Sequence, residues 1–317
     1  MSLIEKAAQR LDQLKQASAE PGEAAVTPAP SAPAVAVSEP VAAVKAAARS
    51  SEVPLAAAHA PAAPVSRMIQ IDLAALAAKG MVTPEQPRSA IAEEYRVIKR
   101  PLLRNATDAS SARIDNANLI MVTSALPGEG KTFSAINLAV SMAMELDYTV
   151  LLVDADVSRP SVFRQLGLPP ERGLMDVLAG DVTDLSDVLL RTNVEKLSIL
   201  PAGMPHQRAT ELLASESMNR LLKQIASRYP DRIVVFDSPP LLVTTESRVL
   251  ATHMGQVVVV VESERTTHAS VKQALATIES CPIKLMLLNK SRQGGPGGYY
   301  GYGYGYGYGE KPRENAA

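Results

Sequence analysis

Residues 118–140 read NLIMVTSALPGEGKTFSAINLAV, and this stretch decides the fold of the chain. An apolar, β-branched run over residues 119–122 predicts a buried strand. A turn rich in glycine and proline follows, and Lys131-Thr132 then opens an amphipathic helical pattern. Strand, glycine-rich loop and helix, in that order, are the setting that a phosphate-binding loop requires.

The composition of this loop suits a nucleoside triphosphate. Successive backbone amides of such a loop converge on a phosphate, and the helix N-terminus adds partial positive charge. We expect Lys131 to reach the β- and γ-phosphates and the Thr132 hydroxyl to bind Mg²⁺. Ala125 stands where the pattern usually has its first glycine. The predicted nucleotide-binding residues are Pro127, Gly128, Glu129, Gly130, Lys131, Thr132 and Phe133.

The overall composition excludes several classes of protein. A net charge of −1 argues against a nucleic-acid-binding protein, whose binding surface would be basic. The single cysteine, Cys281, excludes a disulfide framework and a multi-cysteine metal site, and we expect it to be a buried thiol. No apolar run approaches the roughly 18 residues of a membrane span. Glu5, Lys6 and Arg10 stand where a signal peptide needs an apolar core, which favours the cytoplasm.

Changes in composition divide the chain into four parts. Residues 1–18 carry apolar side chains at helical spacing and predict a short amphipathic helix, which either docks on a partner or frays. Residues 19–66, rich in Ala and Pro, are expected to form a disordered linker. The folded domain is expected at residues 67–290, and residues 291–317 form a flexible tail rich in Gly and Tyr.

Apolar strand-like runs alternate with helical patterns from residue 118 onward, which predicts an α/β fold with a three-layer α/β/α parallel sheet. The expected strands are residues 119–124, 149–153, 197–200, 232–236, 256–261 and 284–288. The expected helices are residues 131–145, 173–178, 210–228 and 267–280. A ligand of such a sheet binds at the carboxyl ends of its strands.

Two of these strands lead into aspartates, as a site for a metal-bound triphosphate requires. Asp154 and Asp156 follow the second expected strand, and Asp237 follows the strand of residues 232–236. Each aspartate could also be a turn former or a helix cap. Three aspartates at the ends of two strands, in a chain that also has a phosphate loop, favour a catalytic site. Mg²⁺ prefers few carboxylates and several waters as ligands, which fits the small number of aspartates at these strand ends.

A further helix is expected at residues 89–104. Glu93, Arg96, Lys99 and Arg100 are placed on one face by their spacing. From spacing alone this would be a solvated charged face.

These motifs carry a family resemblance. ALPGEGKT, LLVDADVSRP and IVVFDSPP resemble the Walker A, A′ and B motifs of bacterial tyrosine kinases of the CpsD/CapB type, which accompany exopolysaccharide synthesis and export. EEYRVIK resembles the family's Glu-x-x-Arg-x-x-Arg oligomerisation helix, with Lys99 in place of the second arginine. The resemblance covers roughly residues 89–308. Within the family, this combination of motifs is most similar to the exosortase-associated subgroup.

The resemblance implies a P-loop NTPase fold of the MinD/ParA type and a kinase that uses ATP and Mg²⁺. Lys131, Asp154, Asp156 and Asp237 are the implied catalytic residues, with Thr132, Asp156 and Asp237 at the metal. Glu93, Arg96, Lys99 and Arg100 would join copies of the chain into a ring. The implied partner is a membrane-embedded polysaccharide co-polymerase, which would place the kinase at the inner membrane.

Six of the nine tyrosines lie within ten residues of the tail, where they alternate with glycine. They are the expected phosphoacceptors: Tyr299, Tyr300, Tyr302, Tyr304, Tyr306 and Tyr308. A tether of about ten residues reaches at most roughly 35 Å, which allows the tail to enter a neighbour's site. The alternative for this segment is a low-complexity stretch that self-associates.

These residues are also compatible with two other functions. The first is a ParA/MinD-type ATPase, although such proteins usually carry an extra lysine early in the phosphate loop and lack a tyrosine tail. The second is a nucleotide-gated assembly protein that transfers no phosphate. A eukaryotic-like kinase is disfavoured because neither HRD nor DFG occurs in the sequence.

Overall fold

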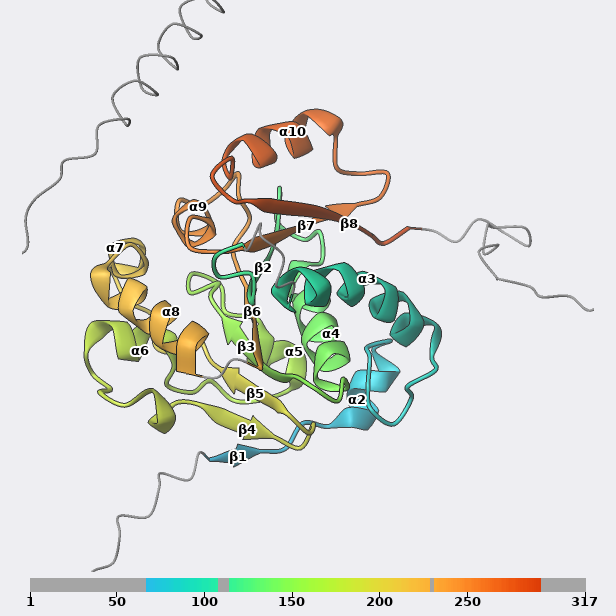
Figure 1. Ribbon diagram of the computed structural model, residues 1–317, viewed down its shortest axis with the longest axis horizontal. Coiled ribbons are helices and arrows are strands. Elements are labelled where there is room, and N and C mark those ends of the chain that lie inside the picture. Colours follow the sequence, from blue (N-terminus) through green and yellow to red (C-terminus); the bar gives the residue numbers. More distant parts are fainter. Residues whose placement is uncertain (1–66, 108–113, 229–230, 292–317) are drawn as a thin grey trace, which may run out of the picture. The chain divides into compact units, whose positions relative to one another are not determined.

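The computed structural model describes residues 67–107, 114–228 and 231–291. The expected N-terminal helix (1–18), the linker (19–66) and the tyrosines of the tail lie outside these residues. The described part forms one eight-stranded sheet with helices on both faces (Figure 1). None of its helices is both long and apolar enough to cross a bilayer.

The strand order of the sheet is β1-β4-β5-β3-β6-β2-β7-β8. The strands are β1 (Met68–Ile69), β2 (Leu119–Ser124), β3 (Thr149–Asp154), β4 (Leu190–Thr192), β5 (Leu197–Leu200), β6 (Arg232–Asp237), β7 (Gln256–Glu262) and β8 (Ile283–Asn289). The phosphate-loop strand β2 lies between β6 and β7, and β3 pairs with β6 on its other side. The carboxyl ends of the central strands therefore meet at one edge of the sheet.

Alternate residues of the central strands enter two separate cores, one on each face of the sheet. In β2, Ile120 and Val122 pack against one helix layer, while Leu119 and Met121 pack against the other. The first layer contains α2 (Leu73–Ala78), α3 (Ala90–Thr107), α4 (Lys131–Ala143) and α5 (Val162–Leu166). The second contains α6 (Leu174–Ala179), the 3₁₀ helix Leu185–Asp187, α7 (Ala209–Leu213), α8 (Glu216–Arg228), α9 (Glu246–Ala251) and α10 (His268–Ala276). The α/β/α architecture predicted from the sequence is confirmed.

The sheet is not wholly parallel, which corrects one expectation. β4 runs antiparallel to β5, while every other neighbouring pair in the described sheet is parallel. Only residues 193–196 connect β4 to β5, and so short a connection can join only antiparallel strands. The edge strand β1 and its neighbour β4 were not predicted.

The single helix expected over residues 210–228 is two helices, α7 and α8. The hydroxyl of Ser215 accepts a hydrogen bond from the Met218 amide at 3.3 Å, as a helix N-cap does. The chain thus ends one helix and starts the next within three residues. Their apolar side chains still enter one core, because Leu213 and Met218 are both fully buried.

The prediction of a solvated charged face on α3 is wrong for Lys99. Its side chain is buried, pairs with Glu145 at 2.8 Å and donates to the Ser141 carbonyl near the end of α4. Burial lowers the pKa of Lys99, and the carboxylate of Glu145 opposes that shift. The ion pair therefore fastens α3 to the C-terminal end of the phosphate-loop helix.

Candidate active site

The phosphate loop joins β2 to α4 at the carboxyl edge of the sheet. Gly128 and Gly130 have φ angles of 87° and 100°, in the left-handed region that other residues avoid. These angles turn the chain so that Lys131 and Thr132 open α4. Pro127 and Gly128 are exposed, whereas Phe133 is half-buried and packs against the core beneath the loop.

Glu129 holds the loop from inside. Its buried carboxylate accepts a hydrogen bond from the Leu126 amide at 2.6 Å and another from the Thr266 hydroxyl. The backbone of the loop is also held from the end of β8. The side-chain amide of Asn289 donates to the Glu129 carbonyl at 2.9 Å, and the Lys290 ammonium donates to the Gly128 carbonyl at 2.7 Å. The bonds from Asn289 and Lys290 go to carbonyls of the loop and not to its amides.

The three predicted aspartates come together at this edge. Asp154 ends β3 and Asp237 ends β6, and the two are directly paired in the sheet register. Asp156 lies two residues beyond Asp154 and pairs with the Lys131 ammonium at 2.6 Å. All three carboxyl groups are buried. The structure therefore places the three aspartates at one edge of the sheet, as expected from the sequence, and their catalytic role stays a prediction.

The carboxylate of Asp237 is buried without partners. Neither of its oxygens has a hydrogen bond within the described residues, and the residue has 0% exposure. Burial raises its pKa to about 8, although the nearby Lys131 ammonium lowers it. The Thr132 hydroxyl also lies close enough to lower this pKa, but its own hydrogen bond is to the Ser161 hydroxyl at 2.8 Å. A buried carboxylate left in this way needs a proton or a ligand to complete it.

Asp154 is half satisfied. Its Oδ2 accepts hydrogen bonds from the Ser161 and Val162 amides at 3.1 and 3.0 Å, while its Oδ1 has no partner in the part of the chain that the structure describes. Burial raises its pKa to about 6, with a smaller contribution in the same direction from the charge of Asp156. A space of about 450 Å³ opens beside this carboxyl group, and Phe163 and Arg164 help to line it.

Four residues that contact the site were not predicted from the sequence: Ser161, Thr266, Asn289 and Lys290. Asn289 ends a parallel strand, so the rule that identified the aspartates could also have found it. Ser161 offered no such signal, because it acts through a fold-dependent contact with Thr132.

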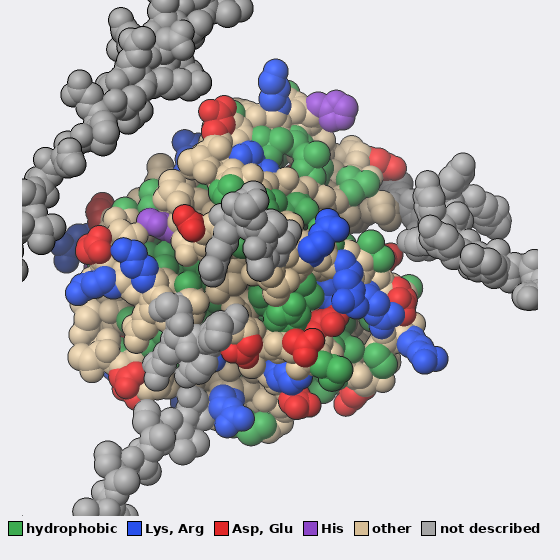
Figure 2. All heavy atoms as spheres, in the orientation of Figure 1, with side chains coloured by type: hydrophobic (Ala, Val, Ile, Leu, Met, Phe, Trp, Pro, Cys, Tyr) green, Lys and Arg blue, Asp and Glu red, His purple; other side chains and the backbone are tan. Residues whose placement is uncertain are grey.

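The predicted oligomerisation residues lie away from this edge, on α3. Arg96 and Glu93 form an exposed ion pair, and Arg100 pairs with Glu145 at 3.4 Å while its own side chain stays exposed. Figure 2 shows Lys and Arg side chains gathered over α3. Lys99 does not contribute to that surface because it is buried.

No three His, Cys, Asp or Glu side chains in the described residues converge as a preformed metal site. A Mg²⁺ ion would not require one, since it is usually held by one or two carboxylates, waters and the phosphates of its substrate. Thr132, Asp156 and the unpartnered oxygens of Asp237 fit that donor set.

The comparisons with known proteins agree with this geometry. Residues 117–290 match the model of the AAA domain family. The chain is 30% identical over 228 residues to the tyrosine-protein kinase YwqD of Bacillus subtilis (strain 168), which covers 70% of this chain and 92% of YwqD. It is 27% identical to the putative tyrosine-protein kinase CapB of Staphylococcus aureus, over 68% of this chain and 91% of CapB. The kinase domain of the Escherichia coli tyrosine kinase ETK matches with a TM-score of 0.59 and 26% identity, over 71% of this chain and 86% of that one. The narrower exosortase-associated assignment stays a prediction.

Proposed function

Because this chain belongs to the bacterial tyrosine-protein kinases, with a nucleotide-binding P-loop of the AAA domain family, we propose that it phosphorylates the tyrosines of its own C-terminal segment. The observation that carries the proposal is the meeting of the phosphate loop with three buried carboxylates at one sheet edge. The proposed phosphoryl donor is ATP. The proposed acceptors are Tyr299, Tyr300, Tyr302, Tyr304, Tyr306 and Tyr308.

The loop would hold the triphosphate through its backbone amides and Lys131. The bonds from Asn289 and Lys290 go to loop carbonyls and so do not compete with a phosphate for the loop amides. Asp156 fixes the Lys131 ammonium at the first turn of α4, where the β- and γ-phosphates would lie. The N-terminus of α4 adds its partial positive charge.

Thr132, Asp156 and Asp237 would hold Mg²⁺. The support is the pair of unpartnered Asp237 oxygens, whose burial is unfavourable unless a proton or a cation neutralises them. When bound, Mg²⁺ neutralises charge on the β- and γ-phosphates. Ser161 would orient the Thr132 hydroxyl toward this position.

Asp154 is proposed to accept the phenolic proton. The tyrosine oxygen forms a bond to the γ-phosphorus while the bond from that phosphorus to the β,γ-bridging oxygen breaks, and ADP leaves. A phenol has an ordinary pKa of about 10, so its proton needs an acceptor as the new bond forms. With a pKa of about 6, Asp154 is ionised above that pH, and its buried Oδ1 has no hydrogen-bond partner among the described residues.

We propose that the transfer occurs between copies in a ring, joined through the exposed face of α3 that carries Glu93, Arg96 and Arg100. Each phosphate adds about −1.5 to −2 charges. Several of them near acidic sites would repel and loosen the ring, which gives a cycle of assembly and release. Lys99 would act in this cycle only indirectly, because it ties α3 to α4.

The proposed partner is a membrane polysaccharide co-polymerase on a separate chain, and the proposed process is exopolysaccharide polymerisation and export. The kinase would sit in the cytoplasm, peripheral to the inner membrane through that partner. In support, the chain is 31% identical over 223 residues to the succinoglycan biosynthesis transport protein ExoP of Rhizobium meliloti (strain 1021).

The test is incubation of the full chain with γ-labelled ATP and Mg²⁺, with and without a co-polymerase tail fragment, followed by mass spectrometry of the C-terminal peptide. We expect label on tail tyrosines, and we expect Lys131→Met to lose it while the surface variant Lys79→Met keeps it. Release of inorganic phosphate without labelled tyrosine would instead favour the ParA/MinD-type ATPase. Nucleotide binding with neither product would leave a nucleotide-gated assembly protein.

A further inference from the structure

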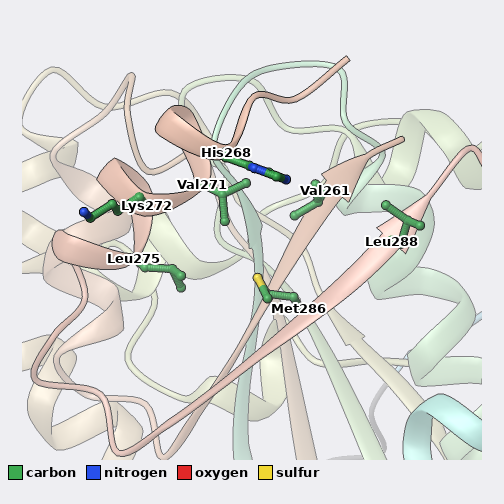
Figure 3. Close-up of a pocket in the computed structure, with 7 residues that line it drawn as sticks. All are labelled: Val261, His268, Val271, Lys272, Leu275, Met286 and Leu288. Atoms are coloured by element: carbon green, nitrogen blue, oxygen red, sulfur yellow. The ribbon is translucent and has the colours of Figure 1, made fainter. Parts of the chain in front are cut away.

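An apolar groove of about 490 Å³ lies between α10 and the last two strands of the sheet. Val261 of β7, Val271 and Leu275 of α10, and Met286 and Leu288 of β8 form its apolar lining. Figure 3 shows Val271 and Leu275 directed from α10 toward the strand that carries Met286. None of these residues belongs to the candidate active site.

The groove leaves large apolar side chains exposed on a strand of the main sheet. Met286 and Leu288 are 65% and 63% exposed, although both lie on a strand of the main sheet. β8 is the last strand in the described sheet and pairs only with β7. In the view of Figure 2, hydrophobic side chains lie open over α10 and β8. An uncovered apolar edge of this kind invites binding or aggregation.

We propose that this groove binds the unphosphorylated tyrosines of the same chain's own C-terminal segment, residues 299–308. The first argument is reach. β8 ends at Asn289, and nine residues, 290–298, separate it from Tyr299. They span up to roughly 30 Å when extended, whereas a seven-residue strand such as β8 is roughly 23 Å long. Residues 294–298 read GGPGG, a composition that favours chain reversal, so the segment can turn back along the strand it has just left.

The second argument is complementary spacing. In an extended chain, alternate side chains share one face at roughly 6.6 Å intervals. Residues 301–308 alternate Gly and Tyr, so four tyrosines would lie on one face with only glycine on the other. Met286 and Leu288 have the same two-residue separation on β8. Rings laid along the groove would therefore meet apolar side chains at matching intervals.

The third argument is chemical. A tyrosine ring gains from apolar burial and from contact with methionine sulfur, while its hydroxyl seeks a polar partner. His268 and Lys272 are the polar residues among those that line the groove, and no carboxylate is among them. The lining thus offers an apolar floor with hydrogen-bonding groups beside it, and it would not repel a phenol.

The consequence for the kinase rests on the proposed function, whereas the docking does not. A docked tyrosine is held outside the candidate active site, because none of the three aspartates lines the groove. A phosphate would bring charge that is costly to bury against the apolar side chains of the groove, and only Lys272 among the lining residues carries a fixed opposite charge, so we expect the groove to prefer the unmodified tyrosines. The groove would act as a store for acceptors that have not yet reacted.

The test is NMR of the methionine methyl groups in the full chain, without ATP or Mg²⁺. Aromatic rings packed on Met286 displace its methyl resonance upfield, and Met286→Leu assigns that signal. We expect the displacement in the wild type and in a variant with all six tail tyrosines changed to Phe, which keeps the rings. We expect its loss when the same six tyrosines become Ser. The methyl group of Met204, 56% exposed and outside the groove, should stay unchanged throughout and reports an intact fold.

A Met286 signal that is the same in the wild type and the Ser variant would overturn the proposal. A second sample mixes the labelled Ser variant with an excess of unlabelled wild type. Recovery of the displaced signal there would show that a different copy's tail occupies the groove, which would overturn the same-chain assignment. Because neither sample contains nucleotide, a failure of tyrosine phosphorylation cannot produce any of these results.

Discussion

The substitution Asp237→Asn should make the metal-free protein more stable, by an amount that grows with pH. In the folded chain the pKa of Asp237 is raised to about 8 because the carboxyl group is fully buried, against an ordinary value of 3.8. The folded state therefore keeps a proton that the unfolded chain has already lost. Between these two values the free energy of unfolding of the wild type falls as the pH rises. Asparagine has nearly the same shape but cannot ionise.

The size of the effect follows from the two pKa values. One pKa unit corresponds to 1.36 kcal/mol, so Asp237 alone should remove about 2 kcal/mol of stability between pH 6 and pH 8. Asp154, whose pKa is raised to about 6, also lowers the free energy of unfolding as the pH rises. This decrease occurs mainly below pH 6 and is common to both proteins. The stability difference between variant and wild type should therefore widen by about 2 kcal/mol from pH 6 to pH 8.

The measurement is urea unfolding followed by far-ultraviolet circular dichroism at pH 6, 7 and 8, with a chelator and without nucleotide. The chain has no tryptophan, so fluorescence of that residue cannot be used. Asp187→Asn, at an exposed carboxylate, is the matched control and should show no widening. Parallel stability curves for Asp237→Asn and wild type would show that the buried carboxyl group is already ionised in the folded chain, and the reasoning would be refuted.

Three further changes test other parts of the structure. Gly130→Ala should abolish nucleotide binding in an equilibrium assay, because the new Cβ would lie 2.0 Å from the side-chain amide nitrogen of Asn289 at a φ of +100°; Gly167→Ala, also at positive φ but with open space around it, should bind normally. Glu145→Gln should lower the free energy of unfolding by roughly 3 kcal/mol, because it leaves the Lys99 ammonium buried without its counter-charge; an unchanged urea midpoint would contradict that account. Cys281 should react with a thiol reagent only after urea unfolds the chain, since the thiol is buried and burial raises its pKa, and rapid labelling of the native protein would show that this region opens.

The sequence was most informative where hydrophobic periodicity was long. The central strands are continuous apolar runs, so the parallel core and the position of the phosphate loop could be predicted together. β1 and β4 have two and three residues, which is too short for alternation to be visible. The break at Ser215 was missed because apolar spacing continues across it and only the hydroxyl contact marks the new helix start.

The residues of the candidate site and its surroundings also differ in how well the sequence predicts their positions. Asp154, Asp156 and Asp237 were predictable because the end of a parallel strand fixes where its next residue lies. The inward direction of Lys99 was not, since helical spacing relates residues to one another but does not say which face meets α4. Its partner Glu145 lies 46 positions along the chain, and such a contact is visible only in the folded structure.

The position of Asn289 and Lys290 governs how this chain should be shortened. A version that ends before Asn289 would lose two donors to the carbonyls of Glu129 and Gly128, and its phosphate loop would lose that support. A version that ends directly after Lys290 removes every tail tyrosine but keeps both donors. Only the second kind of truncation separates loss of the acceptors from damage to the nucleotide site.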